Sequence, residues 1–333
     1  MTDWNELDNN EKIAAIQNVA GIKHIPPQVV EKDLWVTILL QMVYTLPFAD
    51  KIVLKGGTSL SKVFGKIDRF SEDIDLALDR TLFGFQGDMT KKQLKRLRKE
   101  SSLFVNGMFL NELQKVVLEN GHKDLVITGE PNGEGDKTYP EPRKIFIEYK
   151  SLFRDTLDYI KPRVMLEIGA RSMIEPTVPT HIQSLLEMNI QDLSTTKTNP
   201  VVSTAVIEKT FLEKAFLLHE IFSAGAGTLA KRRSRHLYDL EKMMDEPFAA
   251  EAIHNDELWE AISHHRQVFT SMANVDYTPD IRKRIVLVPP QAYIKEWKDD
   301  YDAMRSSMIF GPSLGFEELI SRISILEERF HKI

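Results

Sequence analysis

The N-terminal half of the chain combines one strong helical pattern with several short strand patterns. Apolar residues recur at helical spacing across residues 27–46, and Pro26 and Pro27 are typical of a helix start. Short apolar or alternating runs predict strands at residues 52–54, 73–78, 125–128, 144–149 and 163–168. After the first strand we expect a short helix over residues 58–64, with Thr58 or Ser59 as its N-cap. A long helix is predicted over residues 90–120.

The C-terminal part of the chain shows only helical patterns. The strongest covers residues 201–222, and shorter helices are predicted at residues 235–244, 248–265, 291–304 and 316–330. The sequence therefore predicts an α+β protein with a mixed sheet in its first part. We expect a first domain over residues 1–195 and a helical domain over residues 196–333.

One segment near the first two strands carries groups suited to phosphate and metal chemistry. It contains a turn that opens a helix, where the backbone can approach a ligand and free N–H groups favour an anion. The residues of this turn are Gly56, Gly57, Thr58 and Ser59. On the strand that follows, Asp73 and Asp75 point to one face. Such a carboxylate pair can hold Mg²⁺, which often shares its oxygen ligands with substrate phosphates.

Each half of this segment also has a plain structural explanation. A Gly-Gly-Thr sequence is usually only a turn, and an Asp-x-Asp pair is common on solvated edge strands. The order of strand, glycine turn, helix and strand makes the combination more specific. Together the two halves predict a phosphate site beside a divalent metal, which is the equipment for nucleotidyl transfer.

The composition of the chain excludes several classes of functional site. The 333 residues include no cysteine, which excludes disulfides, thiolate catalysis, iron–sulfur clusters and zinc knuckles. Oxygen-ligated Mg²⁺ is therefore the natural cofactor. The formal net charge of −6 excludes a uniformly basic nucleic-acid coat, but it leaves room for a local basic cleft.

Basic side chains gather in two short stretches, residues 91–99 and residues 231–235. Either stretch is compatible with a solvated helix face or with a footprint on RNA phosphates. In the second stretch, the candidates for RNA contact are Arg232, Arg233 and Arg235.

No signal for export or membrane insertion is found. Residues 1–10 are polar and acidic, and the apolar stretch at residues 34–46 is too short to span a bilayer. We therefore expect no membrane partner and a location in the cytoplasm.

Two strings of residues resemble the AbiEii/AbiGii-type nucleotidyltransferase toxins, a family that includes the MenT group. They are residues 54–62, Leu-Lys-Gly-Gly-Thr-Ser-Leu-Ser-Lys, and residues 69–76, Arg-Phe-Ser-Glu-Asp-Ile-Asp-Leu. Shorter motifs at residues 31–35, 210–214 and 235–239 extend the resemblance in family order. The resemblance implies a polymerase-β-like nucleotidyltransferase core followed by a helical domain.

The resemblance also assigns roles to residues of the two strings. Gly57 and Ser59 take the glycine and serine positions of the family signature, and Asp73 and Asp75 take the metal positions. Polymerase-β-like folds use a third carboxylate from a neighbouring strand. Glu167 is the best candidate for it, and Glu148 is the rival; a solvated strand-edge glutamate is the plain alternative for either.

Basic side chains near these motifs are candidates for phosphate contact. Lys62 and Lys66 follow the glycine turn, and Lys62 is the stronger candidate of the two. Lys214 lies on an apolar helix stripe, so it must be paired, neutral, snorkelling or facing a cleft. The resemblance implies that Lys214 contacts nucleotide phosphates.

The motif at residues 235–239 leaves two explanations open for its aspartate. Asp239 has Arg235 four residues before it, which is the spacing of a weak intrahelical ion pair. The resemblance instead implies a required Asp239, which could orient Lys214 or another basic side chain. His236 is expected to be packed or solvated and not to act as a general base.

These observations lead to one functional prediction with alternatives. We expect an Mg²⁺-dependent nucleotidyltransferase toxin that transfers a nucleotide from an NTP. The resemblance implies tRNA as the acceptor and a separately encoded antitoxin as the controlling partner. Transfer to a protein or a small molecule, and a catalytically silent binding protein with the same fold, remain the alternatives.

Overall fold

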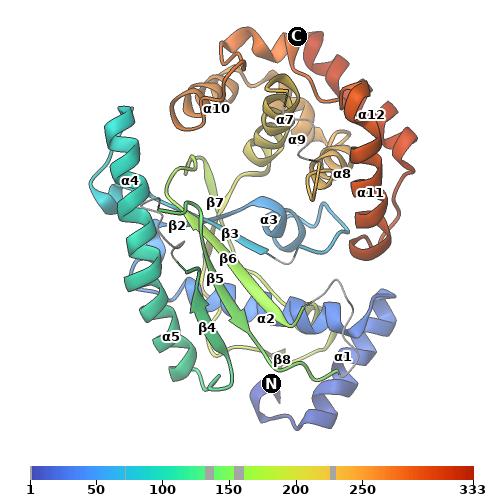
Figure 1. The fold of residues 1–333 in the computed structure, drawn as a ribbon. Helices are drawn as coiled ribbons and strands as arrows, with labels where there is room; N and C mark the ends of the chain where they lie inside the picture. The colour runs from blue at the N-terminus through green and yellow to red at the C-terminus, as the bar shows by residue number, and fades with distance from the viewer. Residues whose placement is uncertain (1, 72, 132–138, 154–160, 226–229) are drawn as a thin grey trace. The chain divides into compact units, whose positions relative to one another are not determined.

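The chain forms two compact units, shown in Figure 1. The computed structural model describes residues 2–71, 73–131, 139–153, 161–225 and 230–333. Unit 1 comprises Met1–Val63 and Phe70–Ala205, and unit 2 comprises Phe64–Arg69 and Val206–Ile333. Unit 2 is therefore assembled from two separate stretches of sequence. The functional domain boundary expected between residues 195 and 196 stays a prediction.

Unit 1 is built on a seven-stranded mixed sheet with the strand order β4-β5-β6-β3-β2-β9-β7. Strand β3 runs antiparallel to β2 and parallel to β6, and β5 runs antiparallel to β6. The strands are β2 (Ile52–Lys55), β3 (Asp73–Leu78), β4 (Val126–Gly129), β5 (Arg143–Glu148), β6 (Arg163–Gly169), β7 (Thr177–Thr180) and β9 (Val202–Ala205). Strands β1 (Thr2–Asp3) and β8 (Leu193–Ser194) form a separate parallel pair.

One face of this sheet is apolar and covered by helices. Ile74 of β3 pairs with Leu166 of β6, which pairs with Ile145 of β5, and all three side chains are buried. Figure 1 shows α2 lying across the sheet and α4 and α5 along its β4 side. The helical segments of unit 1 are η1 (Trp4–Glu6), α1 (Asn9–Lys23), α2 (Pro27–Val43), η2 (Ala49–Lys51), α3 (Gly56–Lys62), η3 (Arg80–Phe83), α4 (Lys91–Phe104), the π-helical η4 (Val105–Phe109), α5 (Leu110–Glu119) and α6 (Leu185–Asn189).

Unit 2 is helical, and aromatic side chains fill its core. Phe216 of α7 stacks on Trp259, with ring centroids 5.0 Å apart, and Phe211 stacks on Phe330 at 6.2 Å. The helical segments are α7 (Ile207–Ser223), α8 (Arg235–Met243), α9 (Pro247–His254), α10 (Asp256–Phe269), η5 (Pro279–Arg284), η6 (Gln291–Tyr293), α11 (Ile294–Met308) and α12 (Phe316–His331). No helix among the described residues is long and apolar enough to cross a membrane.

The observed elements confirm the α+β class with a mixed sheet. Helices α1 and α6 and strand β7 were not predicted, and three predicted helices differ in their bounds or type. The predicted helix at residues 248–265 is two helices, because the side chain of Asn255 accepts a hydrogen bond from the Leu258 N–H and caps α10. The predicted helix at residues 201–222 begins later, because residues 202–205 form strand β9. The long helix at residues 90–120 contains one turn of π-helix.

Candidate active site

Strand β3 places two carboxylates on the sheet face opposite the helices. Asp73 and Asp75 alternate with the buried Ile74 and Leu76, and both aspartates are partly exposed. In the register of the sheet, Asp75 lies directly beside Glu167 of β6. The alternation predicted from sequence therefore places all three carboxylates on one face, because residues paired across a sheet point to the same side.

A cavity of about 150 Å³ opens at this face of the sheet. Asp75 and Glu167 line it, together with Lys55, Glu141 and Arg171. Glu141 accepts a hydrogen bond from the Ala170 N–H at 2.6 Å, and burial raises the pKa of its carboxyl. Sequence reasoning missed Glu141 because it lies in a segment without a periodic pattern, whose place beside β6 is set by tertiary structure.

The two candidates for a third carboxylate occupy different positions. Glu167 lines the cavity with Asp75, and its Oε1 lies 3.3 Å from Lys144 Nζ. Glu148 points to the same face but pairs with Arg163 at the far end of β6, and its side chain is exposed. Among the described residues, the cavity lining includes Glu167 and not Glu148. The catalytic role of Glu167 remains a prediction.

The glycine turn is built directly against the carboxylate of Asp75. Gly56 has a φ of +75°, and a Cβ added at this position would lie 2.1 Å from Asp75 Oδ2. Only glycine combines this backbone angle with such a close approach. Helix α3 begins at Gly56 with Lys55 as its N-cap, so the prediction of Thr58 or Ser59 as the N-cap is wrong.

The two hydroxyls of the turn are buried and already have partners. The Thr58 hydroxyl donates to the main-chain carbonyl of Asp73 and lies 3.1 Å from Ser71 Oγ. The Ser59 hydroxyl donates to the carbonyl of Gly56 at 2.8 Å. The Thr58 bond fixes α3 against β3, and the Ser59 bond lies within α3. Phosphate binding by Gly56, Gly57, Thr58 and Ser59 stays a prediction, and Glu72 of the second string lies outside the described residues.

Lys62 takes part in a buried contact with α2. Its Nζ lies 2.5 Å from Asp33 Oδ1 and donates to the Gln183 carbonyl at 3.2 Å, and the side chain is 9% exposed. Asp33 also accepts a hydrogen bond from the Leu185 N–H. In this structure Lys62 therefore ties α3 to α2, and phosphate contact by Lys62 remains a prediction.

Unit 2 contains a buried ionic network centred on Asp239. Arg69 donates to both oxygens of Asp239, at 2.6 and 2.7 Å, and Lys214 Nζ lies 2.8 Å from Asp239 Oδ2. Burial alone raises the pKa of Asp239, but the charges of Arg69 and Lys214 outweigh it and hold that pKa well below its usual range. The carboxylate of Asp239 therefore stays ionised.

This network shows which basic side chains pair with Asp239. Both ion-pair partners found for Asp239 come from other segments, and Arg235 is not one of them in the described structure. Burial lowers the pKa of Lys214, and the charge of Asp239 opposes that effect. Burial and the charge of Lys214 also hold the pKa of His236 well below its ordinary value, which leaves a neutral ring. Sequence reasoning missed Arg69, although it opens the second family string.

The basic stretches differ in exposure. In α4, Lys91, Lys92, Lys95 and Lys99 are exposed. In unit 2, Arg232 is exposed while Arg233 and Arg235 are partly buried. The Arg232 N–H donates to Asp300 Oδ1 at 2.6 Å, which fixes the backbone at this exposed residue. Lys66 of unit 2 pairs with Glu246 at 2.8 Å.

Asp73 and Asp75 offer carboxylate oxygens, the donor type that Mg²⁺ prefers. Among the described residues, no group of three His, Asp or Glu side chains is placed to hold a metal ion by itself. Mg²⁺ does not need such a cage, because it is usually held by one or two carboxylates together with substrate phosphates. Asp73 and Asp75 therefore fit a metal whose coordination is completed by a nucleotide.

Residues 38–322 match the family described as "Nucleotidyl transferase AbiEii toxin, Type IV TA system". The chain belongs to this family. As a member of the AbiEii family, it is a nucleotidyltransferase toxin of a toxin–antitoxin system. Among solved structures, it is similar to MenT4, a nucleotidyltransferase toxin from Mycobacterium tuberculosis H37Rv, with 14% identity and a TM-score of 0.43. The similarity covers 97% of this chain and 98% of MenT4. No curated protein sequence matches the chain.

Proposed function

We propose that this AbiEii-family protein is an Mg²⁺-dependent enzyme that transfers the NMP group of an NTP to a hydroxyl of tRNA. The observation that carries the proposal is the pairing of Asp75 with Glu167, beside a glycine turn that abuts Asp75. Asp73 extends this set along β3. Exposed carboxylates on one sheet face, next to a cavity, suit a site that must admit a charged substrate.

The carboxylates have different tasks in this proposal. Asp73 and Asp75 would hold Mg²⁺, which when bound supplies positive charge to offset the charge of the reacting phosphates. Glu167 accepts the proton of the attacking hydroxyl, and its Oε1 lies 3.3 Å from Lys144 Nζ. The backbone from Gly56 to Ser59 binds the phosphates of the NTP, with Lys62 as a further contact.

The transfer step is balanced between acceptor and nucleotide. The acceptor oxygen forms a bond to the α-phosphorus, and the bond between the α-phosphorus and the bridging oxygen to the β-phosphate breaks. Pyrophosphate leaves with the electron pair of that bond, and the hydroxyl proton passes to Glu167. In-line displacement of this kind depends on positioning and charge stabilisation.

Lys214 and Asp239 are proposed as functional residues of unit 2, with phosphate contact by Lys214 carried over from the family resemblance. Asp239 Oδ2 lies 2.8 Å from Lys214 Nζ and holds this ammonium group in place. Arg69 fixes Asp239 from the other side with two hydrogen bonds. A bidentate guanidinium contact of this kind fixes direction as well as charge.

The tRNA acceptor is our proposal from the family resemblance, and basic side chains support it. The exposed lysines of α4, together with Arg232, Arg233 and Arg235, supply positive charge for RNA phosphates. A separately encoded antitoxin controls the activity, as the description of the AbiEii family as a type IV system indicates.

The test is transfer of label by the purified full chain. With Mg²⁺, total tRNA and each NTP labelled at the α-phosphate, we expect label on tRNA with at least one NTP. Asp73→Asn should lower the rate by about 10²-fold or more, because a charge-stabilising group at the reacting centre is lost. Asp50→Asn, which changes an exposed aspartate near β2, is the matched control and should leave the rate unchanged.

Other outcomes separate the alternatives. Label on protein would move the proposal to protein modification. Absence of label on RNA, protein and small molecules, together with undiminished growth inhibition by the Asp73→Asn variant, would contradict catalysis at this site.

A further inference from the structure

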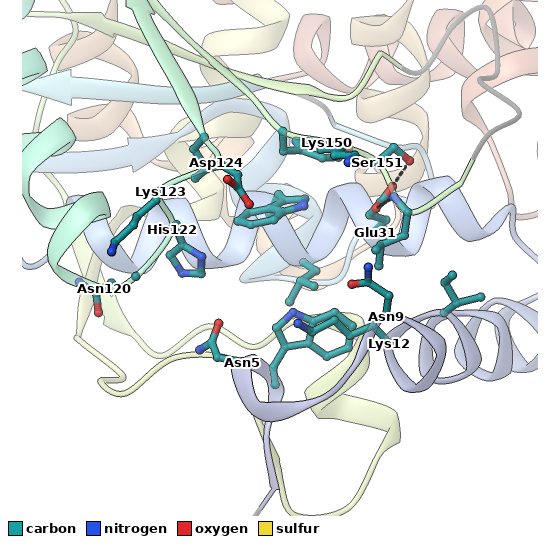
Figure 2. A pocket seen from close by; sticks show the side chains of 18 residues that line it. Asn5, Asn9, Lys12, Glu31, Asn120, His122, Lys123, Asp124, Lys150 and Ser151 are labelled. Atoms are coloured by element: carbon teal, nitrogen blue, oxygen red, sulfur yellow. Dashed lines mark hydrogen bonds between the residues drawn. The ribbon is translucent and has the colours of Figure 1, made fainter.

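A second cavity lies in unit 1, away from the carboxylates. Its volume is about 640 Å³, which is within the range of small-molecule sites. Its walls come from η1 and α1, from α2, and from the segments that follow α5 and β5. Figure 2 shows Lys150 and Ser151 on one side of the cavity, with Asn5, Asn9 and Lys12 on the opposite side.

Aromatic rings form the apolar part of this cavity. Trp35 of α2 stacks on Tyr149, with ring centroids 5.5 Å apart, and His122 meets Trp35 edge-on at 5.4 Å. Trp4 lines the N-terminal side. Trp35 is partly exposed, so its indole offers a surface on which a planar ligand can stack.

Cationic groups surround these rings. Lys12, Lys123 and Lys150 line the cavity, and Lys12 Nζ lies 5.7 Å from the centroid of the Trp4 ring. Burial, with a smaller contribution from Lys12, lowers the pKa of His122, so the ring is neutral at pH 7 and can exchange hydrogen bonds with a ligand.

Two acidic residues also line the cavity, and they differ in availability. The Glu31 carboxylate is buried and accepts hydrogen bonds from Ser151 Oγ at 2.6 Å and from the Leu152 N–H at 2.7 Å. It fixes the wall that carries Lys150. Asp124 is exposed and leaves its carboxylate available as an acceptor for an amino group. Among the described lining residues, three lysines thus accompany one exposed carboxylate.

The sheet separates this cavity from the carboxylate site. Tyr149 directly follows β5 and continues the alternation of the buried Ile145 and Ile147. Its side chain therefore lies on the helix-covered face. Asp75 and Glu167 belong to the other face. A ligand in the second cavity therefore cannot be the NTP whose phosphates meet Asp73 and Asp75.

We propose that this cavity is a second nucleotide-binding site, with the base stacked on Trp35 and the phosphate held by one of the two exposed lysines, Lys123 or Lys150, which lie on different sides of the cavity (Figure 2). A nucleotide joins a planar ring to an anion, which is the combination that the aromatic wall and the lysines offer. Stacking on exposed aromatic rings beside cationic side chains is a recurring way of binding nucleotides, either free or within a single-stranded RNA. Asp124 would accept a hydrogen bond from an exocyclic amino group of the base.

The test is binding of AMP to the full chain in the presence of EDTA, measured by titration calorimetry. EDTA removes divalent metal, so the result does not depend on the proposed catalytic function. We expect saturable binding that is at least tenfold weaker in the Lys123→Ala/Lys150→Ala double variant and in Trp35→Leu. Lys115→Ala, an exposed lysine on α5 outside the cavity lining, is the matched control and should stay within twofold.

Binding measurements with other ligands identify which part of a nucleotide the cavity recognises. Adenosine and inorganic phosphate should each bind at least tenfold more weakly than AMP, because each lacks half of the ligand. A short single-stranded oligoadenylate serves as the second nucleotide source. If only the oligonucleotide binds, and the lysine double variant weakens it, the site takes a nucleotide of an RNA chain; if AMP binds, it takes the free nucleotide.

Three results would overturn the proposal. These are absence of binding by both AMP and the oligonucleotide, equal binding of inorganic phosphate and AMP, and AMP binding that Asp73→Asn abolishes while the lysine double variant keeps it. Thermal unfolding of each variant distinguishes a lost site from a lost fold. Because Lys123 and Lys150 are exposed, the double variant is less prone to loss of folding than Trp35→Leu.

Discussion

The two groups of acidic residues in this protein are kept in opposite environments. Asp73, Asp75 and Glu167 lie partly exposed on an open sheet face, and within the described part of the chain Glu167 forms an ion pair with Lys144. Asp239 is fully buried and holds Arg69 and Lys214 at the same time. Carboxylates that remain accessible can take up an external cation, whereas Asp239 has cations of the chain as its partners.

This difference separates binding from positioning. Desolvation makes a buried carboxylate costly unless its hydrogen bonds are complete, and those of Asp239 are supplied by two cations. Its energetic effect is therefore expected in folding and in the placement of Lys214. The exposed carboxylates carry little folding energy, so their removal should show in catalysis alone.

Breaking the buried network should have the largest effect. Arg69→Met keeps most of the side-chain volume but leaves Asp239 with Lys214 alone. We expect the free energy of unfolding of unit 2 to fall by about 3–5 kcal/mol, because a buried charge loses one of its partners. Denaturant titration followed by the fluorescence of Trp259 and Trp297, both buried in unit 2, measures this loss.

The control for this change is an exposed lysine of the same unit. Lys283→Met removes an equal charge from an exposed position and should change stability by less than about 0.5 kcal/mol. Equal losses in the two variants would contradict the central role given to the buried network.

Removing a carboxylate on the open face tests the other half of the comparison. Glu167→Gln should slow nucleotide transfer by about 10²-fold, the lower range for loss of a general base, while the melting temperature stays close to wild type. The matched control is Glu148→Gln, which alters the same face outside the cavity and should leave the rate within twofold. A larger loss in Glu148→Gln than in Glu167→Gln would reverse the assignment of the third carboxylate.

The smallest effect is expected for the cation beside Glu167. Lys144 and Glu167 are partly exposed, with side-chain exposures of 36% and 25%, so water screens their attraction. Lys144→Met should therefore change the free energy of unfolding by no more than about 1 kcal/mol in thermal or denaturant unfolding. A loss of unfolding free energy as large as that of Arg69→Met would contradict the small contribution of the Lys144–Glu167 pair to folding.

Local patterns in the sequence are enough to predict the main features of the carboxylate site. The alternation in residues 73–78 places Asp73 and Asp75 on one face, and the same alternation in residues 163–168 exposes Glu167. The class of fold follows from the contrast between strand and helix patterns. These features depend on side chains a few residues apart, so a local pattern is sufficient to find them.

Features set by distant contacts could not be predicted in this way. The pairing of Asp75 with Glu167 depends on β3 and β6 being neighbours, although β4 and β5 lie between them in sequence. One partner of Asp239 is Arg69, which lies 170 residues away in the sequence. The N-cap error arose because the Thr58 hydroxyl turns inward to the backbone of Asp73, a contact that a local capping rule does not contain.

The discontinuity of unit 2 has a consequence for folding during synthesis on the ribosome. Arg69 is synthesised long before Asp239 and Lys214, and the segment Phe64–Arg69 must wait for the last part of the chain. Closing so long a loop is entropically costly until the helices of unit 2 can pack around it. If Lys214 acts as proposed, a nascent or truncated chain cannot place it, and the toxin gains its activity only when translation is nearly complete.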